Sequence, residues 1–171
     1  LQSQGKSIPA LVFQPGRQRL ALVAGADYGV GNQWIELWDL ANRKLEKTHP
    51  LEQGGVTSLA FSPDGLVLAT ANSNGGINLY DSEHLTLQAT LALTLTPSLQ
   101  SLSFSPDGKQ LAARGERAIW LWEIATQRLV QTFSFPPANN YSNPQLTFSS
   151  DGQLLATQDD NAITLWRVSD G

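Results

Sequence analysis

Cysteine and methionine are absent from the 171 residues of this chain, and histidine occurs only twice. Without cysteine there is neither a disulfide framework nor a thiolate ligand for a metal. His49 and His84 are 35 residues apart, and neither has a histidine or glutamate four positions on, as a metalloprotease helix would. This leaves almost no material for nucleophilic or zinc catalysis. We therefore expect a protein that is not an enzyme and that binds no cofactor and no metal.

Charged residues and long apolar runs are also scarce. Asp, Glu, Lys and Arg make up 15% of the chain, the formal net charge is −4 and the sequence pI is about 5.0. The basic residues are scattered, unlike the basic stripe of a nucleic-acid-binding domain. No apolar stretch reaches the roughly 18 residues that a membrane-spanning helix needs. We expect no nucleic-acid or membrane partner and a cytoplasmic location, although a disulfide-free periplasmic protein has the same composition.

The missing methionine at position 1 has a second implication. Translation starts at methionine, so we expect these residues to be a processed or excised segment of a longer protein. The composition is that of a folded domain, because 41% of the residues are hydrophobic.

What the chain does contain is an internal repeat. A strand–turn–strand pattern built on Phe-Ser-Pro-Asp-Gly, or a variant of it, recurs at 10–24, 56–71, 99–114 and 145–158. An apolar strand with an aromatic residue near its end follows each copy: Ile35–Asp39, Ile77–Asp81, Ile119–Glu123 and Ile163–Arg167. The phenylalanines are 48, 43 and 44 residues apart, and the aromatics that follow are 42, 42 and 44 apart. A period of about 40–45 residues with this ending is typical of the four-stranded blade of a β-propeller.

The residue types explain why these segments form hairpins. In Ser-Pro-Asp-Gly the proline restricts φ to about −65° at the first corner, aspartate tolerates the second, and glycine takes the position with positive φ. The strands on either side then pair as a hairpin. In the Ile-x-Leu-aromatic strand, Ile and Leu face one side of the blade while x and the aromatic face the other. Because these strands carry few charges, we expect blades that pack face to face.

On its Ser-Pro-Asp-Gly hairpins and Ile-x-Leu-Trp-Asp strands, the chain resembles the WD-repeat β-propeller family over essentially its whole length. The resemblance implies an all-β fold, a β-propeller built from four four-stranded antiparallel blades. The blades are expected near 8–49, 53–92, 98–134 and 141–171. More polar runs at Leu45, Leu87 and Leu129 supply outer strands to the first three. The fourth has none of its own, and residues 1–4 are a candidate outer strand for it.

The chain departs from the family in lacking the usual Gly-His dipeptide before the first strand of each repeat. The family's Asp–His–Ser/Thr–Trp hydrogen-bond network is therefore only partial here. In the last blade it is expected to retain Thr157, Asp159 and Trp166 without the histidine.

The aromatic positions differ in how strongly they indicate packing. The aromatics that recur once per blade are assigned to the blade core: Trp38, Tyr80, Trp122 and Trp166. Trp120 has no aromatic counterpart in the other repeats, so packing between blades and stacking on a ligand are both open for it. Trp34 replaces a small residue of the other repeats and is either a packed side chain or an exposed contact.

The acidic residues indicate turns rather than a catalytic site. Asp64, Asp107 and Asp151 recur in every well-formed hairpin turn, which favours turn chemistry over a carboxylate pair for acid–base catalysis. The run Asp159-Asp160-Asn161 offers oxygens to a hard cation. Its place in a tight hairpin favours capping of its own backbone, so no metal site is assigned.

A binding surface is expected at one rim of the propeller. In this fold the loops after the second strand and after the outer strand of each blade share one rim, opposite the Ser-Pro-Asp-Gly turns. Loops held by a stiff scaffold commonly carry recognition. The candidate binding residues are Tyr28, Val30, Asn32, Trp34, His49, Asn74, Arg114, Glu116, Arg117, Tyr141 and Asp159. The insert 26–34 is foreign to the repeat and carries Tyr28 and Trp34, types that dominate binding hot spots, although a Gly-rich surface loop without a partner has the same sequence.

The function predicted from these features is a non-catalytic protein-interaction scaffold or sensor module. Its partners would be other proteins or attached domains of a longer parent chain. The alternative is a small-molecule-binding or hydrolytic propeller that uses the central channel.

The ends of the repeat array raise the question of closure. An open arc of four blades exposes an apolar face at each end, with Leu20, Leu22, Ile35 and Leu37 expected at one and Leu154, Ile163 and Leu165 at the other. We expect these faces to be covered, either by a second copy in a homodimeric eight-bladed ring or by further blades of the parent. Closure of four blades on themselves is the third arrangement.

Overall fold

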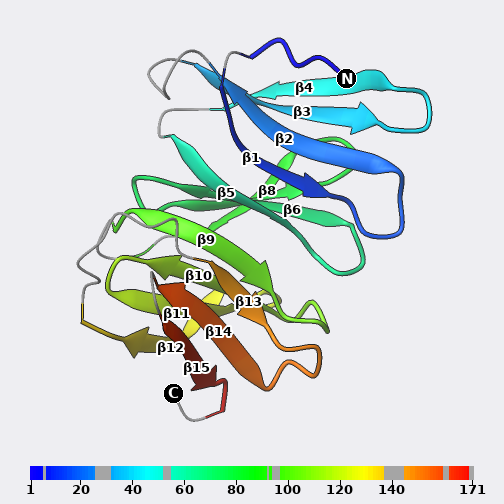
Figure 1. The fold of residues 1–171 in the computed structure, drawn as a ribbon. Coiled ribbons are helices and arrows are strands. Elements are labelled where there is room, and N and C mark those ends of the chain that lie inside the picture. Colours follow the sequence, from blue (N-terminus) through cyan, green and yellow to red (C-terminus); the bar gives the residue numbers. More distant parts are fainter. Residues whose placement is uncertain are drawn as a thin grey trace.

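The structure, a computed structural model, is an array of four antiparallel sheets, and each sheet is one blade (Figure 1). It describes residues 1–5, 7–25, 32–51, 55–91, 93, 97–136, 145–159 and 162–169. Blade 1 contains β1 (Ser7–Phe13), β2 (Arg19–Gly25), β3 (Gln33–Asp39) and β4 (Lys44–Pro50). Blade 2 contains β5 (Val56–Phe61), β6 (Val67–Asn72), β7 (Ile77–Asp81) and β8 (Leu87–Leu91). Blade 3 contains β9 (Leu99–Phe104), β10 (Gln110–Gly115), β11 (Ala118–Glu123) and β12 (Arg128–Ser134).

Blade 4 has three strands in the described part of the chain: β13 (Leu146–Phe148), β14 (Leu154–Asp159) and β15 (Ala162–Arg167). The all-β architecture and the missing fourth strand of this blade agree with the sequence. Residues 1–5 form no strand, and Ser3 and Gln4 hydrogen-bond to Glu36 of blade 1. Their assignment as outer strand of the last blade stays a prediction. Within the ranges given above, no helix is long and apolar enough to cross a membrane.

In blades 2 to 4 the first turn is built by its own side chains. In blade 2 the Ser62 hydroxyl donates to Asp64 at 2.6 Å, and the Asp64 carboxylate accepts from the backbone N–H of Leu66 at 3.0 Å. Gly65 has a φ of 72°, which a residue with a side chain rarely adopts. The same bonds recur in the turns of blades 3 and 4. The predicted turn chemistry is therefore confirmed.

A second capped turn joins the third and fourth strands. The acid that ends the third strand accepts hydrogen bonds from residues two or three positions later, as Asp39 does from the Asn42 N–H and Asp81 from the His84 N–H. The turn then needs one residue with positive φ, which is Arg43 in blade 1 and Leu85 in blade 2. The recurrent acid thus closes a turn in the backbone.

The blades pack face to face around their innermost strands. β1 lies beside β5, β5 beside β9, and β9 beside β13. We call the face that carries Ile and Leu of the third strand the trailing face, and the face that carries the aromatic the leading face. The trailing face of blade 2, with Ile77 and Leu79, packs against Leu102, Phe104 and Trp122 on the leading face of blade 3. Equivalent clusters join blades 1 and 2 and blades 3 and 4.

The two end faces have no such neighbour in the described chain, and Figure 1 shows blades 1 and 4 at opposite ends of the row. Ile163 and Leu165 on the trailing face of blade 4 are 75% and 62% exposed, whereas Ile119 and Leu121 at the same positions of blade 3 are 0% and 1% exposed. The exposed apolar face expected on blade 4 is therefore present.

The expectation for the first blade was wrong. Ile35 and Leu37 lie on its trailing face and are buried against blade 2. The open residues of blade 1 are Leu11 and Phe13 on its leading face, at 59% and 65% exposure. The predicted set of four residues also mixed the two faces, because Leu20 and Leu22 lie opposite Trp38 and Glu36 on the leading face, where Leu22 is buried.

Candidate interaction surface

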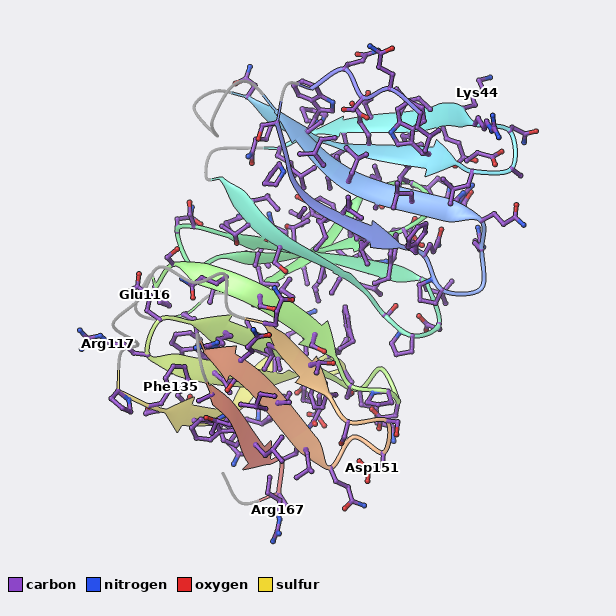
Figure 2. The ribbon with its side chains drawn as sticks, viewed as in Figure 1. Lys44, Glu116, Arg117, Phe135, Asp151 and Arg167 are labelled. Atoms are coloured by element: carbon purple, nitrogen blue, oxygen red, sulfur yellow. The ribbon has the colours of Figure 1, made fainter. Side chains whose placement is uncertain are left out.

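The antiparallel order of the strands places the two kinds of turn at opposite rims. We call the rim formed by the β2–β3, β6–β7 and β10–β11 turns the recognition rim, and the rim formed by the β1–β2, β5–β6, β9–β10 and β13–β14 turns the turn rim. Figure 2 shows Glu116 and Arg117 at the left edge of the molecule and Asp151 at the right. The predicted separation of the two sets of loops is therefore present.

The β10–β11 turn carries two charged residues of the recognition rim. Glu116 and Arg117 are both exposed, and among the described residues their side chains have no hydrogen-bond or ion-pair partner. Asn74 in the β6–β7 turn is exposed as well, and its amide oxygen accepts from the Gly76 N–H at 3.3 Å. Asn32, at the start of β3, is also exposed. Their role in binding stays a prediction.

Arg114 lies inside the molecule and not on the rim surface. Its side chain is 2% exposed, one guanidinium nitrogen donates to the Gln158 carbonyl at 2.8 Å, and the guanidinium lies 5.1 Å from the centre of the Phe135 ring. Arg114 thus joins β10 of blade 3 to β14 of blade 4. Little of it is available to a partner, and a binding role for it stays a prediction.

His49 and Trp34 are half-buried at the recognition-rim end of blade 1. The His49 ring meets the Tyr80 ring edge to face, with centroids 5.3 Å apart, so it packs across the interface between blades 1 and 2. The Trp34 indole N–H donates to Glu36 at 2.9 Å, and the ring packs with the cluster around Trp38. Trp34 is thus packed in part and half-buried, and a binding role for it stays a prediction.

Four predicted binding residues are not placed. Tyr28, Val30 and Tyr141 lie outside the described residues, as does most of the insert 26–34. Asp159 ends β14, but its side chain is outside the described part. Their assignment stays a prediction.

The turn rim uses its carboxylates internally. Hydrogen bonds from Ser62, Ser105 and Ser149 lower the pKa of Asp64, Asp107 and Asp151 from the ordinary value of 3.8. A shallow hollow between the turns of blades 3 and 4 is lined by two of these acids. Since each acid is engaged in its own turn, the hollow presents no free acid–base pair. Within the described ranges, no three His, Asp or Glu side chains gather as they would around a metal ion.

An ion-pair network near the turn rim crosses from blade 1 to blade 2. Arg19 donates to both carboxylate oxygens of Glu83, at 2.7 and 3.1 Å, and Arg17 donates at 2.6 Å. Arg19 also pairs with Glu46 at 2.8 Å. The hydrogen bond from Arg19, followed by that from Arg17, lowers the pKa of Glu83 from 4.5 to about 2. Sequence reasoning missed this network. Arg19 stands where blades 2 and 3 have Val67 and Gln110, and this departure from the repeat could have indicated an ion pair.

Glu36 is the second feature that the sequence did not reveal. It lies on β3 between Trp34 and Trp38, on the leading face of blade 1, and it is 0% exposed. Both indole N–H groups donate to it, Trp34 at 2.9 Å and Trp38 at 2.8 Å. Two further donors come from Ser3 and Gln4. The alternation of β3 placed Glu36 on this face together with Trp34 and Trp38, but the other two donors come from a segment that the repeat does not include.

Three of the four recurrent aromatics lie in the blade core, and the fourth packs against it. Trp38, Tyr80 and Trp122 are buried, and Trp166 is half-buried against Phe133. The Trp166 indole N–H donates to the Thr157 hydroxyl at 3.1 Å. This pair is the part of the expected Thr–Trp network that the structure describes.

Comparison with known proteins gives the same architecture. The family model for the WD40 domain of anaphase-promoting complex subunit 4 matches residues 31–97. WD repeat-containing protein VIP3 of Arabidopsis thaliana is 29% identical over 109 residues, 61% of this chain and 33% of that protein. Small ribosomal subunit protein RACK1y of Oryza sativa subsp. japonica is 28% identical over 120 residues, 70% of this chain and 34% of that protein. The chain belongs to the WD40-repeat family.

The match covers only part of each WD40 relative. The chain spans about a third of the length of VIP3 and of RACK1y. Telomerase protein component 1 of Rattus norvegicus is 30% identical over 125 residues, which is 70% of this chain but 4% of that protein. WD40 domains typically serve as scaffolds for protein interaction and are generally not catalytic.

Proposed function

We propose that this WD40 chain is a non-catalytic scaffold that binds a partner protein through its recognition rim. The family supports the general role. The matched family model describes a subunit of the anaphase-promoting complex, and one relative is named as a protein of the small ribosomal subunit. By analogy, the partners of this chain are other proteins or attached domains of a longer parent.

The contrast between the two rims carries this proposal. On the turn rim the recurrent aspartates already accept hydrogen bonds from their own turns. On the recognition rim Glu116 and Arg117 are exposed on a tight turn, with no partner among the described residues. Two opposite charges on a rigid turn favour a partner with the complementary charges and fix its orientation. Little conformational entropy is lost on binding, because the scaffold already holds the turn in place. The recognition rim is therefore the better surface for a protein.

Site-specific photo-crosslinking tests this assignment. A photoreactive amino acid replaces Glu116 on the recognition rim, and in a control protein it replaces Lys44, which is exposed at the turn-rim end of β4. In extract of the source cells, we expect one partner to be crosslinked from position 116 and none from position 44. Glu116→Lys/Arg117→Glu should abolish binding of that partner to the otherwise native chain. Crosslinks from position 44 alone, or unchanged binding by the double variant, would refute the proposal.

A second proposal concerns the end faces. We propose that two copies pair head to tail, with the trailing face of blade 4 of each copy on the leading face of blade 1 of the other. The residues exposed on these two faces are equivalent to residues that are buried against each other at the three junctions between blades of the chain. Ile163 and Leu165 correspond to the buried Ile77 and Leu79, and the exposed Phe13 corresponds to the buried Phe104. Two such contacts close a ring of eight blades, within the range known for propellers.

Sedimentation equilibrium tests the pairing. For the wild-type chain we expect the mean mass to rise with concentration from 18.5 kDa towards twice that value. Ile163→Asp/Leu165→Asp should remain at 18.5 kDa, because it places charge in the contact. The control Leu87→Asp changes an exposed leucine of the outer strand β8 and should pair like wild type. A wild-type chain that stays monomeric up to millimolar concentration would overturn the proposal.

A further inference from the structure

Glu36 occupies a position that no other blade fills with a charge. The equivalent residues are Asn78, Trp120 and Thr164. A fully buried carboxylate is costly unless donors surround it. Here all four partners donate: the indoles of Trp34 and Trp38 at 2.9 and 2.8 Å, the Ser3 hydroxyl at 3.0 Å and the Gln4 backbone N–H at 3.3 Å. The two indoles come from the blade, so half of the donors depend on residues 1–5.

The segment 1–5 lies closely against the blade at a further point. A Cβ added to Gly5 would lie 2.7 Å from the Ala24 Cβ and 2.8 Å from the Gly25 backbone nitrogen, so a side chain cannot be accommodated there without movement. Ser3 also accepts the Gly5 N–H at 3.1 Å, which fixes the conformation of the segment. Figure 1 shows the segment running over blade 1 on the side away from blade 2. Three features of the segment therefore fit this surface: the Ser3 hydroxyl, the Gln4 backbone N–H and the absence of a side chain at Gly5.

This surface is the one on which a preceding blade would pack. In blades 2 to 4 the leading face is covered by the trailing face of the blade before it. In blade 1 the outer part, around Leu22 and Trp38, is buried, whereas the inner part, with Leu11 and Phe13, is open. Residues 1–5 bond to the outer part. The segment and a docking blade therefore compete for the same area.

We propose that Glu36, Trp34 and Trp38 form a socket that binds residues 1–5 as a removable cap, and that the cap must leave before another blade docks on the leading face. The inference rests on the head-to-tail pairing proposed above. The cap covers the outer half of the face only, so Leu11 and Phe13 remain available for a first contact. Displacement of the cap then removes two donors from Glu36, which water or the incoming blade must replace. The cap thus weakens pairing without preventing it.

Gly5→Val tests the cap, because the added side chain cannot fit against Ala24. Two measurements are made on the same protein: acrylamide quenching of tryptophan fluorescence, which reports the cover over Trp34 and Trp38, and sedimentation equilibrium. We expect stronger quenching and an increase of about tenfold in the association constant, the equivalent of about 1.4 kcal/mol. The matched control is Gln2→Val, an exposed position of the same segment without a bond to the socket, and it should behave as wild type.

The outcomes separate the cap from the pairing. Gly5→Val combined with Ile163→Asp should show strong quenching but no association, because the cap is released and the opposite face is blocked. Unchanged quenching in Gly5→Val would overturn the cap while leaving wild-type pairing intact. Stronger quenching with an unchanged association constant would show that the segment does not compete with docking, and would overturn the proposal. A chain that never associates, even with the cap released, would refute the pairing itself.

Discussion

The trailing faces of blades 3 and 4 carry the same pattern in opposite surroundings. Ile119 and Leu121 are buried beneath the first strand of blade 4, whereas Ile163 and Leu165 have no blade over them in the described chain. Both pairs sit on a third strand of the same length and alternate in the same way. The comparison teaches that the repeat decides which face of a strand is apolar, and that a neighbour decides whether this face contributes to stability.

The largest expected effect is at the centre of an internal face. Trp122→Ala should lower the free energy of unfolding by about 3–5 kcal/mol, because it leaves a cavity between blades 2 and 3. Trp120→Ala should cost clearly less, since this ring is only half-buried, over Gly115. Urea denaturation of the two variants measures the difference. Equal losses would show that Trp120 has no free face and is as much part of the core as Trp122.

A matched pair of isoleucines tests the comparison directly. Ile119→Ala should lower the free energy of unfolding by about 2–5 kcal/mol. Ile163→Ala should change it by less than about 0.5 kcal/mol when measured at concentrations where the chain is monomeric. Thermal unfolding at low and high concentration provides the measurement. If Ile163→Ala is as costly as Ile119→Ala at low concentration, the last face is covered within a single chain and the comparison fails.

The smallest expected effect concerns the ion pairs that cross from blade 1 to blade 2. Because the pKa of Glu83 is about 2 in the folded chain and 4.5 ordinarily, its stabilising effect is complete above pH 4.5 and is lost as the pH falls towards 2. The site is half exposed, so the effect should stay below about 1 kcal/mol. The measurement is the difference in unfolding free energy between wild type and Glu83→Gln, from pH 6 to pH 2. The aspartates of the turns also have lowered pKa values, but they are present in both proteins, so their contribution cancels in the difference. A difference that stays constant over this range would exclude titration of Glu83 as its cause.

The features that could be predicted share one property: their causes lie within a few residues. Asp64 and Gly65 make their turn wherever it occurs, and the alternation of Ile77 and Leu79 with Tyr80 separates two faces in any sheet. The candidate surface could be predicted only in part. The rim on which Glu116 and Arg117 lie follows from strand order, whereas the burial of Arg114 at the same rim does not.

The sequence on its own determined the repeat, the turns, the blade aromatics and the division of each strand into two faces, because these depend on local backbone preference and on a period of two. Only the tertiary structure decided which apolar faces are buried, which direction the next blade takes, and how Glu36 and Glu83 are satisfied. Ser3 is 33 residues from Glu36, and Arg19 is 64 residues from Glu83. The packing of blade 1 on blade 2 brings Arg19 to Glu83, and the segment 1–5 brings Ser3 to Glu36 by lying against blade 1. No local pattern around either glutamate encodes these two contacts.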